Sequence, residues 1–393
     1  MQDASALNNT LGKAIIQGIS TDPRRISTFL SAVFCLIASQ SVRLPDWIFW
    51  IAGATAIKAG SCIRRFIRWM ENSSINPHEW YAPIFRHAMQ EWGQMPIFLV
   101  LDTSMLYDCF CCVRISMIYM NRAIPVTWCV LEHDSPSVKY KQYAHLFERV
   151  IPLLPEKVEI FFLADRGFVC KNLMRRLQEL GWNWRIRVKN NQKLRTTNGN
   201  FIIPKMLPLS IGKVLLFTQN LNFGKGLERI SLSAAWARGS QEPWYVLSGD
   251  AASTEIFVEY SRRFGIEEGF RDEKSGGCDL EEGCIRDAEK LERLLLVVST
   301  ALIVAVSEGV SVTLAGKQEE VDPHQTRSLS YFQIGLRWIL KSLLHDSKKL
   351  FCLCLLRSMN DPIPVASTEK ESRRRRKEKD PKHLFKHVQF ASL

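Results

Sequence analysis

The stretch KVEIFFLADRGF, residues 157–168, contains five consecutive apolar residues followed at once by aspartate, arginine and glycine. A short, continuous apolar run predicts a strand that is buried on both faces, as in a parallel sheet. Amphipathic helical patterns flank this run at residues 137–154 and 170–182. Strands that alternate with helices predict an α/β sheet, with Asp165 just past the end of one of its strands.

Further strands are expected on both sides of this unit. Residues 95–104, MPIFLVLDTS, form a second short apolar run that ends in Asp102. Residues 111–131 predict two strands around a tight Asn121-Arg122 turn, and residues 183–190 predict one more. The resulting order is three strands, helix, strand, helix and strand, in which a meander is followed by helical crossovers. This is the order of a ribonuclease H-like α/β sheet.

The rest of the chain divides by its texture. Apolar residues recur at helical spacing before residue 95, and short strands with polar turns follow residue 190. We expect five parts: a helical DNA-binding region at 1–95, the first part of the core at 96–189, a β-rich insertion at 190–253, the second part of the core at 254–310, and a C-terminal helical region with a basic tail at 311–393.

Charge and cysteine usage limit the classes of function. The 52 basic and 40 acidic residues leave a net charge of +12, which favours an anionic partner such as nucleic acid. Cys109 and Cys112 form a CxxC pair, but no second pair of ligands follows at zinc spacing, and the pair lies in an apolar run. We therefore expect buried strand cysteines in a reducing, cytosolic setting.

No membrane segment is expected. The longest apolar runs, FLSAVFCLIA and LLLVVSTALIVAV, are shorter than the ~20 residues that span a bilayer, so both predict buried core helices. The first residues lack the basic start and apolar core of a signal peptide.

The two strand-ending aspartates are the first candidates for chemistry. Asp102 and Asp165 each follow a buried apolar strand, and open α/β sheets bind ligands at that edge. One such residue often only caps the next turn, but two on neighbouring strands are harder to explain in that way. Paired oxygen donors without histidine or cysteine suit a hard divalent cation such as Mg²⁺.

A third carboxylate is expected from YSRRFGIEEGFRDEK, residues 260–274. On an ideal helix Tyr260, Arg263, Glu267 and Lys274 share one stripe about 60° wide. Glu267 would complete a two-metal site, and the phenol and the two cations would hold phosphates beside the scissile bond. The competing interpretation is an exposed helix laced by i,i+4 ion pairs.

Two glycines occupy the other side of the same helix. Gly265 and Gly269 fall roughly opposite the stripe, and each costs ~1 kcal/mol relative to alanine. Close packing of the helix against the sheet would offset that cost.

Together these residues carry a resemblance to a known family. The spacing Tyr260-(2)-Arg263-(3)-Glu267-(6)-Lys274 resembles the Tyr-Arg-Glu-Lys signature of bacterial insertion-sequence DDE transposases. LVLDTS and LADRGF are similar to that family's first two catalytic motifs, and the NRAIPVTW hairpin and the EPWYVLS strand are also similar. The resemblance covers roughly residues 60 to 300.

The resemblance implies a fold and a mechanism. The fold is a ribonuclease H-like core interrupted by a β-rich insertion. The reaction is cut-and-paste transposition through a DNA hairpin, in a synaptic homodimer with two transposon ends. Asp102, Asp165 and Glu267 would be catalytic and would bind two Mg²⁺ ions, with Mn²⁺ as a possible substitute. The protein would act on double-stranded DNA, both its own inverted-repeat ends and a target, in the bacterial cytosol or nucleoid.

The DNA-binding residues implied by the resemblance are those of the signature and its surroundings: Tyr260, Arg263, Lys274, Trp244 and Arg166. Trp244 matches a tryptophan that stacks on a flipped base in the family, although a core position in the insertion is the competing interpretation. Phe264 departs from the pattern, because relatives often carry tryptophan there, which puts a stacking role at this position in doubt.

Basic clusters outside the core are weaker candidates. Arg64, Arg65 and Arg68 follow a helix–turn-like AIKAGSC, so they predict a recognition helix over DNA or merely a solvated basic face. The tail from Arg373 to Lys379 predicts non-specific DNA affinity. Two other functions stay open: an inactive, transposon-derived DNA-binding protein, and a Mg²⁺-dependent nuclease of the same fold. A zinc-binding regulator lacks ligands.

Overall fold

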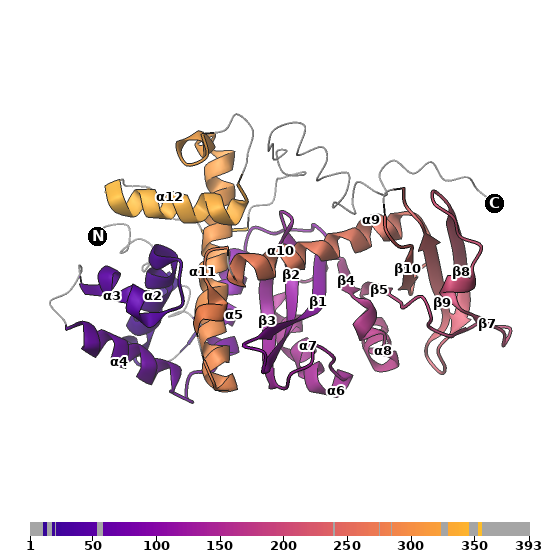
Figure 1. The fold of residues 1–393 in the computed structure, drawn as a ribbon, viewed down its shortest axis with the longest axis horizontal. Coiled ribbons are helices and arrows are strands. Elements are labelled where there is room, and N and C mark those ends of the chain that lie inside the picture. Colours follow the sequence, from indigo (N-terminus) through magenta and orange to yellow (C-terminus); the bar gives the residue numbers. More distant parts are fainter. Residues whose placement is uncertain are drawn as a thin grey trace.

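A mixed sheet forms the centre of the computed structural model, which describes residues 11–13, 18–19, 21–52, 58–238, 240–274, 276–283, 285–323, 329–345 and 353–355. Eight strands hydrogen-bond in the order β3-β2-β1-β4-β5-β10-β9-β8 (Figure 1). Helical regions lie at one end of this sheet, and the β-rich part of the chain lies at the other. The expected α/β class is confirmed.

The first five strands follow the predicted order. An antiparallel meander comes first, and two strands parallel to β1 follow through helical crossovers. The meander strands are β1 (Ile97–Leu106), β2 (Phe110–Tyr119) and β3 (Arg122–Glu132). The crossover elements are α6 (Tyr140–Tyr143), α7 (His145–Val150), β4 (Ile160–Ala164), α8 (Lys171–Glu179) and β5 (Asn183–Arg187).

The β-rich insertion extends the central sheet. Its last strand pairs with β5 in antiparallel register, with Val246 opposite Arg187. An unpaired edge of β5 would expose its backbone hydrogen-bonding groups, and the inserted strands satisfy them. These strands are β6 (Leu194–Arg195), β7 (Phe201–Ile202), β8 (Val214–Asn222), β9 (Glu228–Ala235) and β10 (Trp244–Ser248).

The helix expected from residue 254 is interrupted by one tighter turn. It consists of α9 (Glu255–Ser261), a 3₁₀ turn at Arg262–Phe264 and α10 (Gly265–Lys274). A Cβ at Gly265 would lie 3.2 Å from Ile118, and one at Gly269 would lie 3.2 Å from Ala123. The predicted close packing of this helix against the sheet is therefore confirmed, because the glycines let it approach the β2–β3 hairpin.

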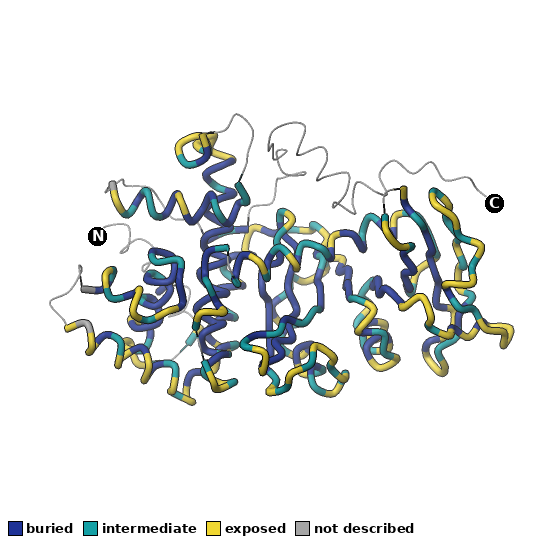
Figure 2. The backbone as a smooth tube through the Cα atoms, viewed as in Figure 1, coloured by how far each residue is buried: buried dark blue, intermediate teal, exposed yellow. Residues whose placement is uncertain are grey.

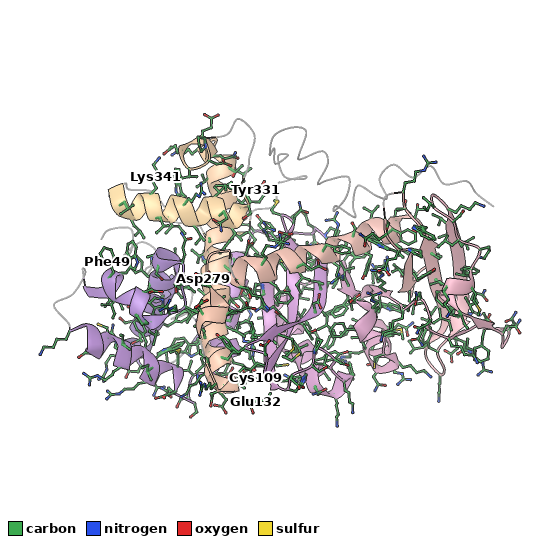
Figure 3. The ribbon with its side chains drawn as sticks, viewed as in Figure 1. Phe49, Cys109, Glu132, Asp279, Tyr331 and Lys341 are labelled. Carbon is green, nitrogen blue, oxygen red and sulfur yellow. The ribbon has the colours of Figure 1, made fainter. Side chains whose placement is uncertain are left out.

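Four helices precede the sheet. They are α2 (Pro23–Ser39), α3 (Leu44–Ala52), α4 (Ala59–Met70) and α5 (Pro77–Ala88). As the sequence predicts, α5 begins at Asn76, whose side chain accepts hydrogen bonds from the backbone N–H groups of the next turn. Phe49 on α3 is 76% exposed and lies at the surface of this helical region (Figure 3).

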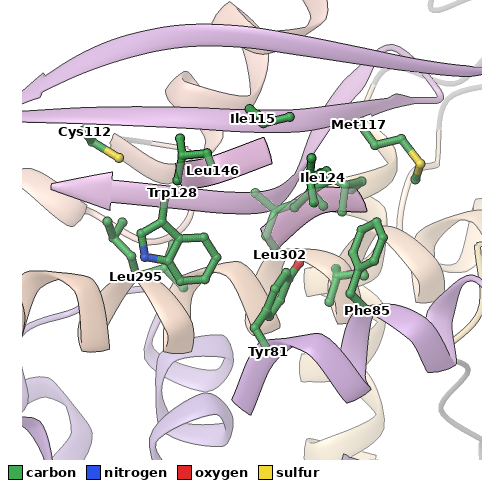
Figure 4. Close-up of a cluster of buried hydrophobic side chains, with 14 of the residues drawn as sticks. Tyr81, Phe85, Cys112, Ile115, Met117, Ile124, Trp128, Leu146, Leu295 and Leu302 are labelled. Carbon is green, nitrogen blue, oxygen red and sulfur yellow. The ribbon is translucent and has the colours of Figure 1, made fainter. Parts of the chain in front are cut away.

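A single long helix, α11 (Ala288–Leu314), joins these regions. It contacts α2, α5, β3 and α12 (Tyr331–His345) and is buried along most of its length (Figure 2). Beneath the meander, Leu295 and Leu302 of α11 pack with Trp128 of β3 and with Tyr81 and Phe85 of α5 (Figure 4). The core of the molecule therefore lies between the sheet and these helices.

The expected lengths of the apolar helices need correction. In the described part of the chain, α11 has 27 residues and is long and apolar enough to cross a membrane, but 94% of its apolar window is buried in the protein. The helix outgrows its apolar run because polar residues extend its first turn. Helices α2 and α3 would count only together, and they are bent by 100°. The buried-core interpretation of α11 is confirmed.

The cysteine prediction holds only in part. Cys112 is buried in β2, but Cys109 is exposed in the turn before that strand (Figure 3). The turn places Cys109 outside the hydrogen-bonded ladder, where no neighbouring strand covers it. The basic tail from Arg373 to Lys379 lies outside the described residues.

Candidate active site

Asp102 and Asp165 lie side by side at one edge of the sheet. Strands β1 and β4 run parallel, with Leu101 opposite Ala164, so the two aspartates come next on each strand. β1 does not end at Asp102, as the sequence suggested, but continues to Leu106 along β2. Asp102 therefore lies where β1 passes the end of β4.

Strand alternation determines the face to which these carboxylates point. Val100 and Leu163 pack in one cluster with Ile266 of α10. Because side chains alternate with period two, Asp102 and Asp165, two residues further on, face the same helix. The Asp165 side chain does not cap the 3₁₀ turn that follows it, which removes the simplest structural explanation of that residue.

Arg263 joins the first and third predicted carboxylates. Its Nη1 donates to Asp102 Oδ2 at 2.8 Å, and its Nη2 donates to Glu267 Oε1 at 2.7 Å. The Arg263 side chain is 7% exposed, whereas that of Glu267 is 53% exposed. The 3₁₀ turn and α10 thus bring Glu267 to the edge that carries the two aspartates.

The electrostatics show that these groups share one site. Burial raises the pKa of Asp102 to about 6, and the charges of Asp165 and Glu267 raise it further, while Arg263 opposes the shift. Burial alone would lower the pKa of Arg263, but Tyr260 and the three carboxylates outweigh it, so the pKa is raised. The guanidinium therefore stays charged between acids that repel one another.

The donor set fits a hard divalent cation. Among the described residues no three histidine, cysteine, aspartate or glutamate side chains are arranged as a ready metal cluster. The reason lies in the site itself, because a guanidinium already neutralises Asp102 and Glu267. Carboxylate oxygens alone are the ligands that Mg²⁺ and Mn²⁺ prefer, so the residues fit such an ion once the arginine moves.

Two hydrogen-bond donors of the signature are left without partners in the described structure. The Tyr260 hydroxyl and Arg263 Nε are buried and have no hydrogen-bond acceptor. Burial raises the pKa of Tyr260 to about 12, so its hydroxyl remains a donor at neutral pH. Buried donors without acceptors are costly, and both are suited to a phosphate oxygen.

The remaining signature residue is already engaged. Lys274 Nζ donates to the Met105 carbonyl at 2.8 Å and lies 2.7 Å from Glu281. Because Arg263 and Lys274 both bond to β1, the predicted stripe does face that strand. Lys274 contacts it beyond Asp102.

Trp244 lies in a small core at the start of β10. It is 4% exposed, packs edge-on against Tyr260 at 5.5 Å and stacks on Phe264 at 5.7 Å. This is the position of the competing core interpretation, and its role on a flipped base stays a prediction. Arg166 is half exposed and lies 3.6 Å from Glu242.

The three arginines of α4 lie in the N-terminal helical region, on the far side of α11 from the carboxylates (Figure 1). Arg64, Arg65 and Arg68 are all exposed, and none forms an ion pair with an acid of the described chain. The structure does not bring them to the carboxylate edge.

Sequence reasoning missed the ion pairs that fix α10. Arg114 Nη1 donates to Glu273 at 2.5 Å, with both side chains buried, although 159 residues separate them. Arg122 lies 3.1 Å from Glu268 and 3.0 Å from Asp272. No local pattern identifies such pairs. The only signal was an arginine inside an apolar strand, since β2 contains Arg114 among buried residues.

Comparison with known proteins supports one family. Residues 125–304 match a family model described as a transposase DDE domain. The match includes Asp165 and Glu267 and begins after Asp102. No curated protein matches the sequence.

One solved structure with a similar arrangement is the piggyBac transposase synaptic complex with hairpin DNA. It is 10% identical, with 95% of this chain and 85% of that chain covered at a TM-score of 0.42. Since a TM-score of this size does not establish a common fold, the argument depends on the family match and the site.

Proposed function

With a transposase DDE domain at residues 125–304, this chain is a DDE transposase, and we propose that it excises and reinserts its own insertion sequence through a DNA hairpin. One observation carries the proposal. Asp102 and Asp165 are neighbours on parallel strands, and Glu267 reaches Asp102 through a shared guanidinium. Such a convergence of three acids around one cation suits phosphoryl transfer.

The residues take distinct roles. Asp102, Asp165 and Glu267 would bind two Mg²⁺ ions, with Mn²⁺ as a substitute. When bound, such ions activate the attacking oxygen and stabilise the leaving oxygen of an in-line displacement. Tyr260 and Arg263, whose buried donors lack acceptors, would hold the phosphates beside the scissile bond.

The reaction would proceed in displacement steps at phosphorus. Water attacks the phosphodiester at a transposon end, and the bond from phosphorus to the 3′ oxygen breaks, which leaves a 3′ hydroxyl. That hydroxyl then attacks the opposite strand, closes a hairpin and releases the flanking DNA. Hydrolysis of the hairpin restores the 3′ hydroxyl, which finally attacks the target.

The proposal includes the partners and the organisation of the chain. The partners would be two inverted-repeat ends and a target duplex, bound by a homodimer in the bacterial cytosol or nucleoid. The helical region before residue 95 would bind the ends, while the core, divided by the insertion at 190–253, would cut them.

A cleavage assay on the DNA that flanks the coding region tests the proposal. The purified protein should nick, form hairpins and join strands on short inverted repeats in Mg²⁺. Alanine at Asp102, Asp165 or Glu267 should reduce cleavage at least a thousandfold, while binding to end DNA stays within a fewfold. Denaturing gels would resolve the hairpin, because it joins both strands into one.

Glu268→Gln is the matched control. Glu268 neighbours Glu267 but bonds to Arg122 and Arg271, away from the aspartates. It should cleave nearly normally. Cleavage without strand joining would instead identify a nuclease, and end binding without cleavage would identify an inactive DNA-binding protein. Near-normal cleavage by Asp165→Ala would exclude the proposed carboxylates.

A further inference from the structure

A pocket opens beside the catalytic edge and plays no part in the site described above. Its volume is about 370 Å³, and its walls include Val138, Tyr140, Val169 and Cys170, with Lys139 and Lys141 also in the lining. A volume of this size lies within the range of ~300–1,000 Å³ typical of small-molecule sites. The pocket is therefore large enough to accept a ligand the size of a nucleotide.

The pocket lies at the same edge of the sheet as Asp102 and Asp165. One wall is the loop after β3 and the other is the turn after β4, and both strands run parallel to β1. The Thr103 hydroxyl donates to the Pro136 carbonyl of the first wall at 3.2 Å. The Phe168 N–H donates to the Asp165 carbonyl at 2.9 Å in the second wall. Each wall is thus fastened directly beside a catalytic aspartate.

An aromatic stack supports the pocket from beneath. Tyr140 contacts Tyr143 edge-on at 5.5 Å, and Tyr143 contacts Phe168 edge-on at 5.8 Å. Tyr143 and Phe168 are buried, whereas Tyr140 is partly exposed. The ring of Tyr140 is therefore held in place while part of it remains open to a ligand, as stacking on a base requires.

The lysines give the pocket a positive rim. Lys139 and Lys141 are exposed, and neither is within ion-pair distance of an acid in the described chain. The acids near Tyr140 are otherwise occupied, because Glu148 and Glu179 lie 2.6 Å and 3.8 Å from Arg176. The ligand that fits this rim carries negative charge.

We propose that this pocket binds one unpaired nucleotide of the DNA end, with its base against the Tyr140 wall and its phosphate held by Lys139 and Lys141. The inference builds on the proposed function, because a hairpin forces a sharp bend that unstacks bases near the cut. Stacking on a protein ring returns ~1–3 kcal/mol per base. Since Trp244 is covered by Tyr260 and Phe264, this pocket is the more open place for such a base.

Cross-linking would locate the nucleotide. End DNA carrying 5-iododeoxyuridine at successive positions around the cut is irradiated with the full-length protein, without divalent metal. One position should cross-link strongly to the peptide that contains residues 138–143, and Tyr140→Ala should reduce that cross-link at least fivefold. The melting temperature of Tyr140→Ala is measured alongside.

A charge-removal experiment tests the rim independently of Tyr140. Lys139→Gln/Lys141→Gln should weaken end binding about tenfold and reduce the salt slope by roughly one to two phosphate contacts. The control is Lys157→Gln/Lys317→Gln, which removes two exposed lysines elsewhere on the protein, and it should change binding less than threefold.

The outcomes separate the two levels of the proposal. A wild-type protein that cleaves end DNA, but gives no cross-link at residues 138–143 and no difference between the two lysine pairs, would overturn the pocket alone. A wild-type protein that neither binds nor cleaves end DNA would overturn the proposed function and the pocket with it.

Discussion

The Arg263 guanidinium binds Asp102, which lies 161 residues earlier in the chain, and Glu267, which lies one turn later on its own helix. A basic side chain thus lies between two acids to which a divalent cation is proposed to bind. It also keeps a buried Nε without an acceptor. Arg263 therefore has a second partner to gain, namely a DNA phosphate, when it releases the carboxylates.

Removing this guanidinium should make metal binding independent of DNA. Arg263→Gln leaves Asp102 and Glu267 without their counter-ion, so the DNA-free protein should bind Mn²⁺ at least tenfold more tightly by calorimetry or electron paramagnetic resonance. Its affinity for end DNA should fall. Arg262→Gln is the control, because Arg262 lies over the Phe98 ring. Equal Mn²⁺ affinity in wild type and Arg263→Gln would contradict the exchange.

Gly269→Ala should displace the helix that carries Glu267. The added Cβ would lie 3.2 Å from both the Ala123 Cβ and its carbonyl oxygen, so α10 must shift by tenths of an ångström. The Mg²⁺ concentration for half-maximal cleavage should rise severalfold. Stability should change by no more than about 1 kcal/mol, because alanine favours the helix. Gly60→Ala in α4, where nothing lies within 4 Å, should leave the Mg²⁺ dependence unchanged.

Truncation of Trp244 should distinguish packing from base stacking. Because the ring is 4% exposed, Trp244→Ala should cost ~3–5 kcal/mol of stability and reduce nicking and hairpin formation together. If the ring also stacks on an extruded base, the more conservative Trp244→Phe should retain nicking and lose hairpins. Gel quantification of the hairpin-to-nick ratio, beside a melting curve, decides between these roles. An unchanged ratio in both variants would remove Trp244 from hairpin formation.

The α4 arginines should contribute to end recognition through charge. Replacing Arg64, Arg65 and Arg68 with glutamine should weaken binding and reduce the dependence of log K on log salt by about 0.9 per lost phosphate contact. Cleavage chemistry on pre-bound DNA should stay intact, because these residues lie across α11 from the carboxylates. A footprint and salt slope that match the wild type would instead indicate a solvated face.

The arrangement of the two aspartates could be predicted because apolar runs of similar length end at each of them. Parallel pairing then brings them together, as the register of Leu101 and Ala164 shows. The stripe that contains Arg263 and Glu267 could be predicted from helical spacing, and the tighter turn at Arg262–Phe264 did not remove it. Local periodicity was sufficient wherever one element determined the geometry.

Features that depend on distant partners could not be predicted. The Arg114–Glu273 pair joins a strand to a helix 159 residues later, and no spacing rule covers such a distance. The extension of the sheet by β10 also depends on which edge is free after folding. The pocket walls meet only once β3 and β4 are parallel, although the alternation in Lys139-Tyr140-Lys141 after a strand was a usable signal.

The long helix α11 limits how the enzyme can be divided for experiments. All the proposed catalytic side chains precede residue 275, so a fragment that ends there would contain every reactive group. It would nevertheless lack the 27-residue helix that packs against α2, α5 and β3. Such a fragment would expose Trp128, Tyr81 and the rest of that core to water, and we expect it to aggregate. A usable catalytic fragment must therefore extend at least through Leu314, which makes a part of the chain without any reacting group a requirement for activity.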